Sequence, residues 1–491
     1  MSGINIASFI AARSRLGVGQ RFGKNVNNRA RLFGGTTSVT ALRTGRYCLP
    51  PPPPPRPRSA TAASTGGGGA IISERAVRQA SSCSRVRPAA RAAGGARWLT
   101  TTSDHESSGR DFREDEEMIR ETVSKFASDV IAPRVRDMDA SSKMDPAVIS
   151  GLFENGLMGI EAPEKYGGSA LNFSSACIVV EEIAKVDPAV AVLVDIHNTL
   201  IVNMLRFWGS EELQEKYFAR ICSRSVSSFC LSEVGSGSDA FSLSTKATPS
   251  ADGSYYTIEG EKMWISNAKE AELFFVFANV DPSKGYKGIT CFVVEKEFGG
   301  ITVGPKEDKL GIRASSTCPV TFSDCKVPKA NVLGEVGQGY KYAIEILNEG
   351  RIGIAAQMVG LARGCMEDTL PYLYERKQFG QPVGDFQGMQ HQVAQVATEI
   401  EAATALYRSA ARMKEAGEPF VKEAAMCKLY TSQVAERTAS KCVEWLGGVG
   451  FTKAFLAEKF YRDCKIGGIY EGTSNIQLST IAKLMRQDHA P

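Results

Sequence analysis

The sequence lacks the residue patterns that bind metal ions or form a disulfide framework. It has 12 cysteines and four histidines in 491 residues, but no two cysteines form a CxxC pair and the histidines have no ligand-like spacing. Zinc sites and disulfide-rich folds need such spacings. We therefore expect no metal site, and we interpret the scattered cysteines as reduced thiols that mostly fill the core.

Long apolar runs are also scarce. The longest apolar stretches, of which Leu273–Ala278 is an example, are far shorter than the roughly 20 residues with which a helix crosses a bilayer. The hydrophobic share of 43% and the charged share of 23% are typical of globular proteins. We therefore expect a soluble protein without a membrane span.

Acidic residues are almost absent from the first hundred positions, where Glu74 stands against 16 arginines and lysines. The rest of the chain holds 42 basic and 53 acidic residues, so the net charge of +4 conceals a mildly acidic body. An acidic body argues against nucleic acid as the partner of the folded part.

The basic N-terminal segment contains Pro50–Pro55 and Gly66–Gly69 and few residues that form a core. Arginine-rich, acid-poor N-termini are typical of organelle transit peptides. We predict a disordered transit peptide and linker over residues 1–109, with cleavage between Arg97 and Ser108. We place the protein in the mitochondrial matrix in preference to a plastid, although a nucleic-acid-binding tail would share this composition.

The hydrophobic period changes twice along the body. We predict an N-terminal helical domain over 110–226, a central β-domain over 227–335 and a C-terminal four-helix-bundle domain over 336–491. No long helix interrupts the central region, which favours a small antiparallel sheet or barrel over a βαβ array. The fold class is therefore mainly α with a central β-domain. The expected helices span 116–131, 146–155, 174–186, 189–208, 211–221, 342–376, 385–416, 420–446 and 475–485, and the expected strands span 255–258, 273–280, 289–295 and 320–322.

Near the C-terminus, the segment Ile469–Gln477 carries one carboxylate, Glu471, between an aromatic residue and a glycine. Thr473 and Ser474 are residue types that cap a helix N-terminus, so Glu471 is expected on a loop just before a helix. A carboxylate whose surroundings raise its pKa can serve as a base. Taken alone, this segment is more often a solvated glutamate beside an ordinary cap.

Three other segments carry residues suited to binding. The Gly/Ser-rich loop after Phe229 can donate backbone N–H groups to a ligand or can be a plain turn. Trp264 with Ser266 suits packing against a flat polar ring, although a buried tryptophan in a sheet is commoner. Arg376 can bind a phosphate or cap a helix, and the helix end at Glu444–Gly448 has the same ambiguity.

Together the segments FCLSEVGSGSD, KMWISNA, KLGIRASSTCPVTF, NEGRIGIAAQM, ERKQFGQP, EWLGGVGF and IYEGTSNIQL resemble the signatures of the acyl-CoA dehydrogenase family, in the order of that family. The resemblance covers about residues 111–485. It implies an FAD-dependent enzyme that oxidises an acyl-CoA to a trans-2-enoyl-CoA, with a base that removes the α-proton while the β-hydrogen leaves as hydride to the flavin.

The resemblance assigns roles by position. Glu471 matches the catalytic base. The positions that match contacts to FAD are Phe229, Leu231, Ser232, Gly237, Ser238, Trp264, Ile265, Ser266, Glu444, Trp445, Leu446, Gly447, Gly448, Thr473, Ser474 and Asn475, together with Arg376, Phe379 and Gln387 toward a neighbouring subunit. The positions that match contacts to the acyl-CoA are Ser238, Tyr286, Tyr340, Asn348, Glu349, Gly350 and Arg351.

The resemblance also implies partners and alternatives. It is strongest to short/branched-chain members, so 2-methylbutanoyl-, isobutanoyl- and butanoyl-CoA are the expected substrates, in branched-chain amino acid and fatty acid degradation. Electron-transfer flavoprotein is the expected electron acceptor, and a homotetramer the expected assembly. An acyl-CoA oxidase and a non-catalytic acyl-CoA- or flavin-binding scaffold are the alternatives.

One competing position for the base lies within the chain. Some family members carry the base directly before an arginine that matches Arg351. That position is Gly350 here, and the nearby Glu349 lies one residue, or a rotation of roughly 100° on a helix, away. We therefore expect Glu349 to point away from the substrate and retain Glu471 as the predicted base.

Overall fold

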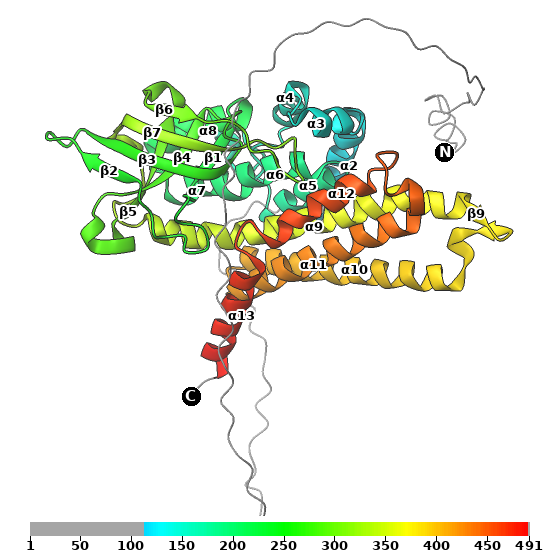
Figure 1. The fold of residues 1–491 in the computed structure, drawn as a ribbon. Coiled ribbons are helices and arrows are strands. Elements are labelled where there is room, and N and C mark those ends of the chain that lie inside the picture. The colour runs from blue at the N-terminus through cyan, green and yellow to red at the C-terminus, as the bar shows by residue number, and fades with distance from the viewer. Residues whose placement is uncertain (1–111, 490–491) are drawn as a thin grey trace, which may run out of the picture. The chain divides into compact units, whose positions relative to one another are not determined.

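The computed structural model describes residues 112–489, and the predicted transit peptide lies outside the described residues. The described part runs from helices through a sheet to helices (Figure 1). The first helical part comprises α2 (Phe112–Phe126), η1 (Ala127–Ile131), η2 (Ala132–Arg134), α3 (Val135–Ser141), α4 (Pro146–Glu154), η3 (Glu164–Tyr166), α5 (Phe173–Ala184), α6 (Pro188–Asp195), η4 (Ile196–Val202), α7 (Asn203–Trp208) and α8 (Glu211–Ser223).

Side-chain caps set the starts of several of these helices. The side chains of Asp145, Asn172, Asp187 and Ser210 each accept a backbone N–H from the first turn that follows. Such a cap satisfies one of the donors that a helix N-terminus leaves free. The predicted start of α4 after Asp145 is therefore confirmed.

The sheet contains β1 (Ser227–Cys230), β2 (Lys246–Pro249), β3 (Tyr255–Ser266), β4 (Leu273–Asn279), β5 (Ile289–Glu295), β6 (Ile301–Val303), β7 (Thr317–Pro328) and β8 (Val332–Leu333), with η5 (Pro282–Gly288), η6 (Lys296–Phe298) and η7 (Lys329–Asn331) between strands. Its order is β6-β7-β3-β2-β4-β5-β8, and β1 pairs with β4.

The expectation of a purely antiparallel sheet was wrong in two pairings. β1 lies parallel to β4, with Ser227 opposite Leu273, and β2 meets β4 in parallel at one position. Parallel strands need a long connection between them, and the chain between β1 and β4 supplies it by forming β2 and β3. The parallel pairing positions the end of β1 and the loop that follows it.

Both faces of β4 are covered. Phe274, Val276 and Ala278 belong to a core within the β-domain, whereas Phe275 and Phe277 belong to the core shared with the helices. Side chains alternate between the faces of a strand. This double burial explains why the sequence of β4 is a continuous apolar run instead of an alternating pattern.

The C-terminal part contains long helices. They are α9 (Gly339–Glu375), α10 (Gln387–Glu415), α11 (Val421–Leu446), α12 (Ala457–Cys464) and α13 (Ser474–His489), with β9 (Lys377–Gln378), β10 (Gln381–Pro382), η8 (Val383–Asp385), η9 (Gly447–Val449) and η10 (Lys465–Gly468) in the connections. At 1.5 Å per residue, α9 is about 55 Å long. One end of α9 lies by the sheet, and the β9–β10 hairpin lies at its other end (Figure 1).

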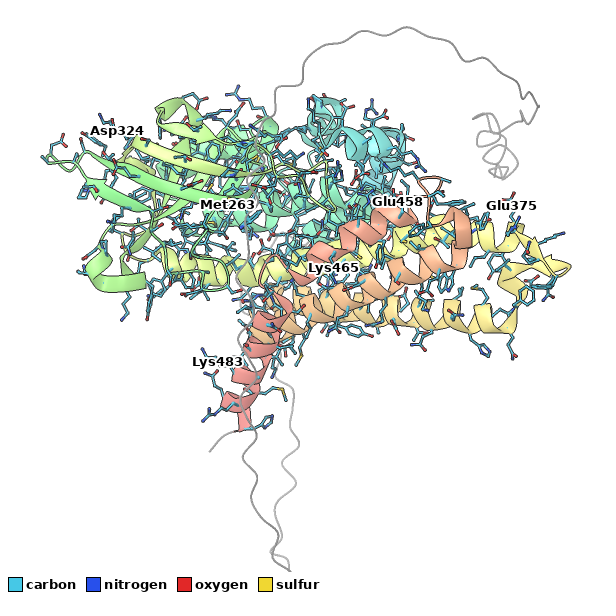
Figure 2. All side chains as sticks on the ribbon, in the orientation of Figure 1. Met263, Asp324, Glu375, Glu458, Lys465 and Lys483 are labelled. Atoms are coloured by element: carbon cyan, nitrogen blue, oxygen red, sulfur yellow. The ribbon has the colours of Figure 1, made fainter. Side chains whose placement is uncertain are left out.

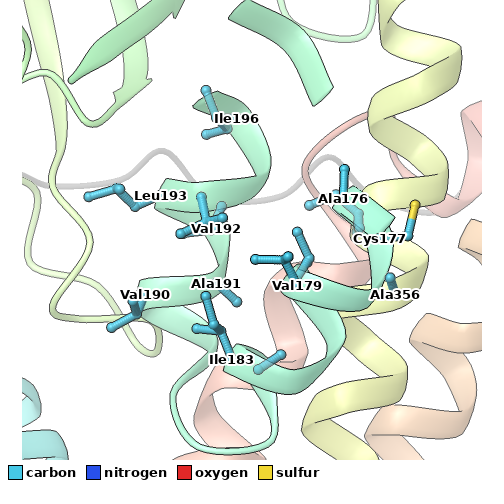
Figure 3. Packing of buried hydrophobic residues seen from close by; sticks show 14 of the residues in the cluster. Ala176, Cys177, Val179, Ile183, Val190, Ala191, Val192, Leu193, Ile196 and Ala356 are labelled. Atoms are coloured by element: carbon cyan, nitrogen blue, oxygen red, sulfur yellow. The ribbon is translucent and has the colours of Figure 1, made fainter. Parts of the chain in front are cut away.

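The core joins the first helices to α9. Val179, Ile183, Val190 and Val192 are fully buried among α5 and α6, and Ala356 of α9 lies beside them (Figure 3). Small residues on α9 let these helices approach closely. Helix α9 is thus packed against α5 and α6 of the first helical part.

One segment of the described residues, Pro188–Trp208, is long and apolar enough to qualify as a membrane span by length and composition, and the 18-residue window on which this rests is buried. One helix was predicted over 189–208, and the structure forms α6, η4 and α7 there; the expectation that every apolar stretch is far too short to span a bilayer was wrong for this segment. A mostly buried segment of this kind is typical of a core helix.

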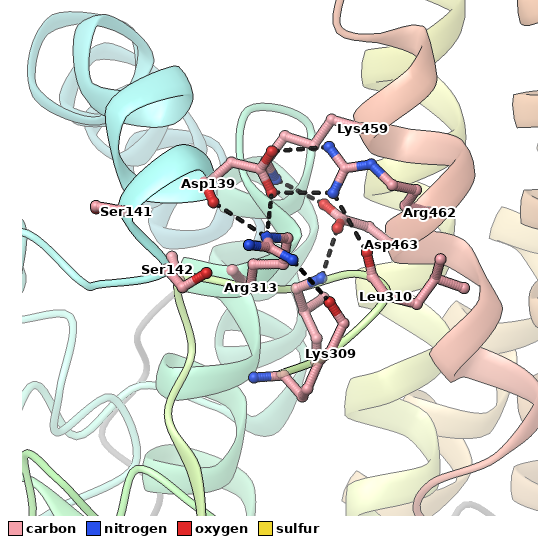
Figure 4. Close-up of polar contacts among 12 residues, drawn as sticks. Asp139, Ser141, Ser142, Lys309, Leu310, Arg313, Lys459, Arg462 and Asp463 are labelled. Atoms are coloured by element: carbon pink, nitrogen blue, oxygen red, sulfur yellow. Dashed lines mark hydrogen bonds and ion pairs between the residues drawn. The ribbon is translucent and has the colours of Figure 1, made fainter. Parts of the chain in front are cut away.

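A polar cluster joins three parts of the fold (Figure 4). Arg462 of α12 donates to both carboxylate oxygens of Asp139 of α3, at 2.7 and 3.1 Å, and to the carbonyl of Leu310 at 3.3 Å. Arg313 donates to the Asp139 carbonyl at 3.2 Å. These contacts attach the loop before β7 to both helical parts.

Candidate active site

Glu471 lies in the short loop between η10 and α13. The helix begins at Ser474, and the Thr473 hydroxyl accepts the N–H of Ile476 at 3.3 Å, so the predicted position of Glu471 just before a helix is confirmed. Glu471 has φ 51°, in the left-handed region that non-glycine residues avoid. Its backbone N–H forms no hydrogen bond with any of the described residues. Strained backbone of this kind favours a functional interpretation of the loop.

The Glu471 carboxylate points into the protein. Its Oε2 atom is buried and has no hydrogen-bond partner among the described residues, although the residue as a whole is partly exposed. A Cβ placed on Gly350 would lie 3.0 Å from both this oxygen and Leu200 of η4. The carboxylate therefore packs against α9 at the position where the competing base would stand.

Burial raises the pKa of Glu471 to about 7, although the positive charges of Lys428 and Arg351 act in the opposite direction. A carboxylic acid with a pKa near neutrality is suited to taking up a proton at working pH. The pKa of Glu471 thus results from two opposed effects, because burial raises it and the two neighbouring cations lower it.

Two side chains hold the loop by its carbonyl groups. Lys428 of α11 donates to the carbonyls of Gly467 and Gly472 at 2.6 and 2.8 Å. Gln477 of α13 donates to the carbonyls of Glu471 and Gly472 at 3.1 and 2.9 Å. The loop that carries Glu471 is therefore fixed to both α11 and α13.

A second carboxylate, Asp195, lies close to the first. The Thr199 hydroxyl donates to Asp195 at 3.1 Å, and a Cβ on Gly353 would overlap the same carboxylate oxygen. Because Gly350 and Gly353 are three residues apart on α9, they lie on one face of it, and the two carboxylates rest on neighbouring turns. Burial and then Glu471 raise the pKa of Asp195 well above its usual range.

The two charged side chains that flank Gly350 on α9, those of Arg351 and Glu349, have different partners. Arg351 donates to the Asn348 carboxamide at 2.8 Å, and its Nε is buried without a hydrogen-bond partner among the described residues. Glu349 accepts from Asn203 at 2.8 Å and pairs with Lys414 at 3.3 Å. The Glu349 side chain is therefore engaged away from Glu471, as the helical rotation predicted.

The predicted flavin segments of the β-domain are adjacent in space. Lys262 of β3 donates to the Leu231 carbonyl at 3.0 Å and to the Glu233 carboxylate at 2.8 Å, and the N–H of Met263 donates to the Ser232 carbonyl at 2.9 Å. Burial alone would raise the pKa of Glu233, but Lys262 and its hydrogen bonds lower it to about 2. This ion pair anchors the Gly/Ser loop to β3.

Several features of this region fit a flavin. Trp264 has φ 64° and its side chain is 58% exposed, which leaves a flat aromatic surface available for packing. Gly237 and Ser238 are exposed, their N–H groups bond to none of the described residues, and a Cβ on Gly237 would meet nothing within 4 Å. Phe229, Ile265 and Ser266 lie in the strands beneath, where β1 also contacts η4.

The remaining predicted positions lie in three places. Tyr286 of η5 and Tyr340 of α9 form an edge-to-face pair with ring centroids 5.0 Å apart. At the end of α11, Trp445 and Leu446 are buried, Glu444 pairs with Lys441, and Gly447 and Gly448 are exposed with open space around them. Ser474 and Asn475 form the first turn of α13.

Arg376, Phe379 and Gln387 do not join the rest of the site within one chain. All three are exposed at the hairpin end of α9, where Phe379 is 96% exposed and has φ 51°. Arg376 lies 26 residues beyond Gly350, or about 39 Å along the helix. Figure 2 shows Glu375 far from Met263, the neighbour of Trp264.

Sequence reasoning missed Lys428, Asp195 and Gln477. Lys428 is fully buried, and Ala424, Thr431 and Ser432, its neighbours at helical spacing, are buried as well. A lysine among small residues on the buried face of a helix was the available signal. Asp195 gave a weaker signal in the sequence, because a single acidic residue in an apolar run also occurs at helix ends.

A cleft of about 780 Å³ lies between α2, α5, α9 and α10 and is lined by charged residues, including Arg120, Glu182, Lys185 and Arg363. None of the predicted site residues lines it. Its side chains pair with one another, as Arg120 does with Glu182, so it is an ion-pair network apart from the chemistry described above.

The chain matches three domains of one family along its described part. Residues 113–225 match the acyl-CoA dehydrogenase N-terminal domain, residues 228–325 the middle domain and residues 337–485 the C-terminal domain. The fold and the match together define a flavin-dependent oxidoreductase. The chain belongs to the acyl-CoA dehydrogenase family, and it is an FAD-dependent flavoprotein, as solved relatives complexed with FAD and FADH2 also indicate.

Individual relatives agree. The mitochondrial short/branched chain specific acyl-CoA dehydrogenase of Rattus norvegicus is 58% identical over 372 residues, which are 76% of this chain and 86% of the relative. Butyryl-CoA dehydrogenase of Megasphaera elsdenii superposes with a TM-score of 0.74 at 36% identity, covering 77% of this chain and 98% of that structure. A chain from a study of the electron transferring flavoprotein of Acidaminococcus fermentans superposes with a TM-score of 0.74 at 38% identity, covering 76% of this chain and 98% of that chain.

Proposed function

We propose that this enzyme removes hydrogen from the α- and β-carbons of short or short-branched acyl-CoA thioesters, giving trans-2-enoyl-CoA, with Glu471 as the base that takes the α-proton. The observation that carries the proposal is the Glu471 carboxylate. Its buried Oε2 lacks a partner among the described residues, and burial raises its pKa to about 7. Such a group is poised to accept a proton near neutral pH.

The chain contributes position and electrostatics to the reaction. The Glu471 N–H, which bonds to none of the described residues, is a donor suited to the thioester carbonyl, and this hydrogen bond would acidify the α-carbon. Glu471 Oε2 would then accept the α-proton. An acyl chain packed over the carboxylate would exclude water and keep the proton affinity high.

Trp264 and the Gly237–Ser238 loop, with Ser266 beside Trp264 in β3, would hold the flavin ring and its polar edge. The exposed Trp264 ring and the loop N–H groups, which bond to none of the described residues, support this. When bound, FAD supplies the two-electron acceptor that takes the β-hydrogen as hydride. Tyr286 and Tyr340 would contact the acyl-CoA outside the reacting centre.

We further propose that Arg376, Phe379 and Gln387 complete the FAD site of a neighbouring subunit in a homotetramer. Their distance of about 39 Å along α9 from Gly350 and the exposure of the Phe379 ring support this reading. Arginine binds phosphate groups bidentately, so Arg376 would contact the FAD pyrophosphate.

Substrate class, partner, location and domain limits are part of the same proposal. 2-Methylbutanoyl-, isobutanoyl- and butanoyl-CoA are the substrates to compare, and the named relatives support a short or branched acyl chain. Electron-transfer flavoprotein would accept the electrons in the mitochondrial matrix. The domains would span residues 110–226, 227–335 and 336–491.

Glu471→Gln tests the proposal, because glutamine keeps the shape but cannot take the proton. The variant should retain FAD and lose more than about 1,000-fold in kcat, in keeping with the loss of an essential base, in an assay with butanoyl-CoA and a dye acceptor. Glu436→Gln, at an exposed glutamate paired with Lys465, is the matched control and should retain activity. Near-normal turnover by Glu471→Gln would refute the assignment.

A further inference from the structure

Lys428 differs from the other lysines buried in the described part of the chain. Lys262 pairs with Glu233 at 2.8 Å, and Lys459 pairs with Asp187 at 2.8 Å and Asp463 at 2.6 Å. Lys428 is equally buried but has no carboxylate within 4.0 Å among the described residues. A buried ammonium without an ion-pair partner costs several kcal/mol, so its position needs an explanation.

Holding the loop does not explain the charge. The Gly467 carbonyl also accepts from the Ser432 hydroxyl at 2.9 Å, and the Gly472 carbonyl also accepts from Gln477 at 2.9 Å. Each carbonyl that Lys428 contacts therefore has a second, uncharged donor. What Lys428 alone adds at this place is a positive charge behind the loop that carries Glu471, present below the pKa of Lys428, which burial lowers to about 8.

The other groups around Glu471 leave this charge uncompensated. Burial and Glu471 raise the pKa of Asp195 on α6 well above its usual range, and burial raises the pKa of Tyr470 likewise. Cys427, whose pKa burial raises to about 12, is neutral as well. Arg351 on α9 is the second cation. Glu471 is thus the group on which both positive charges act.

We propose that Lys428 is a positioning residue that supplies a buried positive charge to Glu471 and thereby keeps the carboxylate ionised for proton abstraction at working pH. The proposal rests on Glu471 as the base. It assigns Lys428 an electrostatic task, and it assigns the uncharged donors Ser432 and Gln477 the task of holding the loop.

Lys428→Met removes the charge and leaves a side chain of similar length. In the FAD-loaded enzyme, the acid limb of kcat/KM against pH with butanoyl-CoA should move up by about one pH unit, as expected for loss of an opposite charge nearby. This is roughly a tenfold loss at pH 6, with recovery at high pH. Ser432→Ala, which removes a loop hydrogen bond without changing charge, should leave the limb in place.

A second readout does not depend on turnover. The proton uptake of Lys428→Met, minus that of Lys428→Met with Glu471→Gln, gives the titration of Glu471 directly. Its midpoint should lie higher than in the same comparison made with Lys428 present. An unmoved limb and midpoint, or an equal shift in Ser432→Ala, would overturn the proposal.

The two proposals fail in different ways. If Glu471→Gln stays active while the titration midpoint still moves in Lys428→Met, the base assignment fails but the electrostatic link stands. If Lys428→Met does not fold, adding Glu471→Gln should restore folding, because an uncompensated buried carboxylate is then removed. Failure of that rescue would refute the link.

Discussion

Replacing Glu471 by glutamine should make the folded protein more stable, and the gain should grow as the pH rises from 5 to 7.5. Burial holds the pKa of Glu471 at about 7 in the folded protein, against 4.5 for an ordinary glutamate. Between these values the unfolded chain has released the proton while the folded chain retains it. The unfolded state then binds fewer protons, so the stability of the wild type falls as pH rises.

The size of the effect follows from the same values. A pKa raised from 4.5 to about 7 corresponds to about 3 kcal/mol at about 1.36 kcal/mol per pH unit. The loss is complete once the pH exceeds the folded pKa. Glutamine has no such titration, so any cost of burying its amide is an offset that does not change with pH.

Thermal or chemical denaturation of FAD-loaded wild type and variant at pH 5, 6, 7 and 7.5 measures the difference. With about 380 described residues, an unfolding entropy of about 0.8 kcal/mol per kelvin makes about 3 kcal/mol equal to a shift in Tm of roughly 4 °C. Glu436→Gln should change the stability by less than about 1 kcal/mol, because exposed ion pairs contribute little.

A difference between variant and wild type that stays constant over this pH range would contradict the reasoning. It would mean that the Glu471 carboxylate is solvated or paired in solution, and that its proton affinity is ordinary. A difference that shrinks with pH would mean that the two cations outweigh burial, and Glu471 would then be a weaker base than proposed.

Three further changes test other parts of the site. Asp195→Asn should leave the acid limb of kcat/KM against pH in place, because burial raises the pKa of Asp195 well above its usual range and favours its protonated form; a shifted limb would show that it is ionised. Gly353→Ala should destabilise the fold by about 1–3 kcal/mol in chemical denaturation, because its Cβ overlaps Asp195, whereas Gly388→Ala, where a Cβ meets nothing within 4 Å, should not. Arg376→Ala should weaken FAD retention by about 10- to 100-fold in a dissociation assay, the value of a charge-assisted hydrogen bond; unchanged retention would refute the role across subunits.

Much of the fold was predictable because its elements are long and amphipathic. The expected helix 420–446 is observed as α11, Val421–Leu446, and the expected strand 289–295 is observed as β5. Apolar periodicity, together with Gly447 at the end of α11, sets these limits locally. Short elements such as α12 and β8 were missed, because a few residues carry too little pattern to separate a helix or strand from a loop.

The candidate site could be predicted from the sequence mainly through the family resemblance. The position of Glu471 just before a helix followed from the local capping residues, but its segment alone favoured a solvated glutamate, and its assignment as the base came from the resemblance. Lys428 and Asp195 are buried, and their properties depend on the partners that tertiary packing brings to them. Their sequence neighbours do not reveal those partners. The parallel pairing of β1 with β4 was missed for the same reason, since it depends on contacts between segments more than forty residues apart.

The glycines of α9 relate the packing of the fold to the position of the candidate site. A Cβ at Gly353 would overlap Asp195, and Cβ atoms at Gly360 and Gly364 would overlap the backbone carbonyls of Glu181 and Lys185. Each glycine costs a helix interior about 1 kcal/mol relative to alanine, so a helix that keeps several on one face needs the close approach. Here that approach seats α5 and α6 directly against α9, and it leaves the space beside Gly350 to the Glu471 carboxylate. A glycine-rich helix in a sequence of this kind therefore indicates which face of the bundle receives the polar groups of the site, even where the identity of those groups is not evident from the sequence.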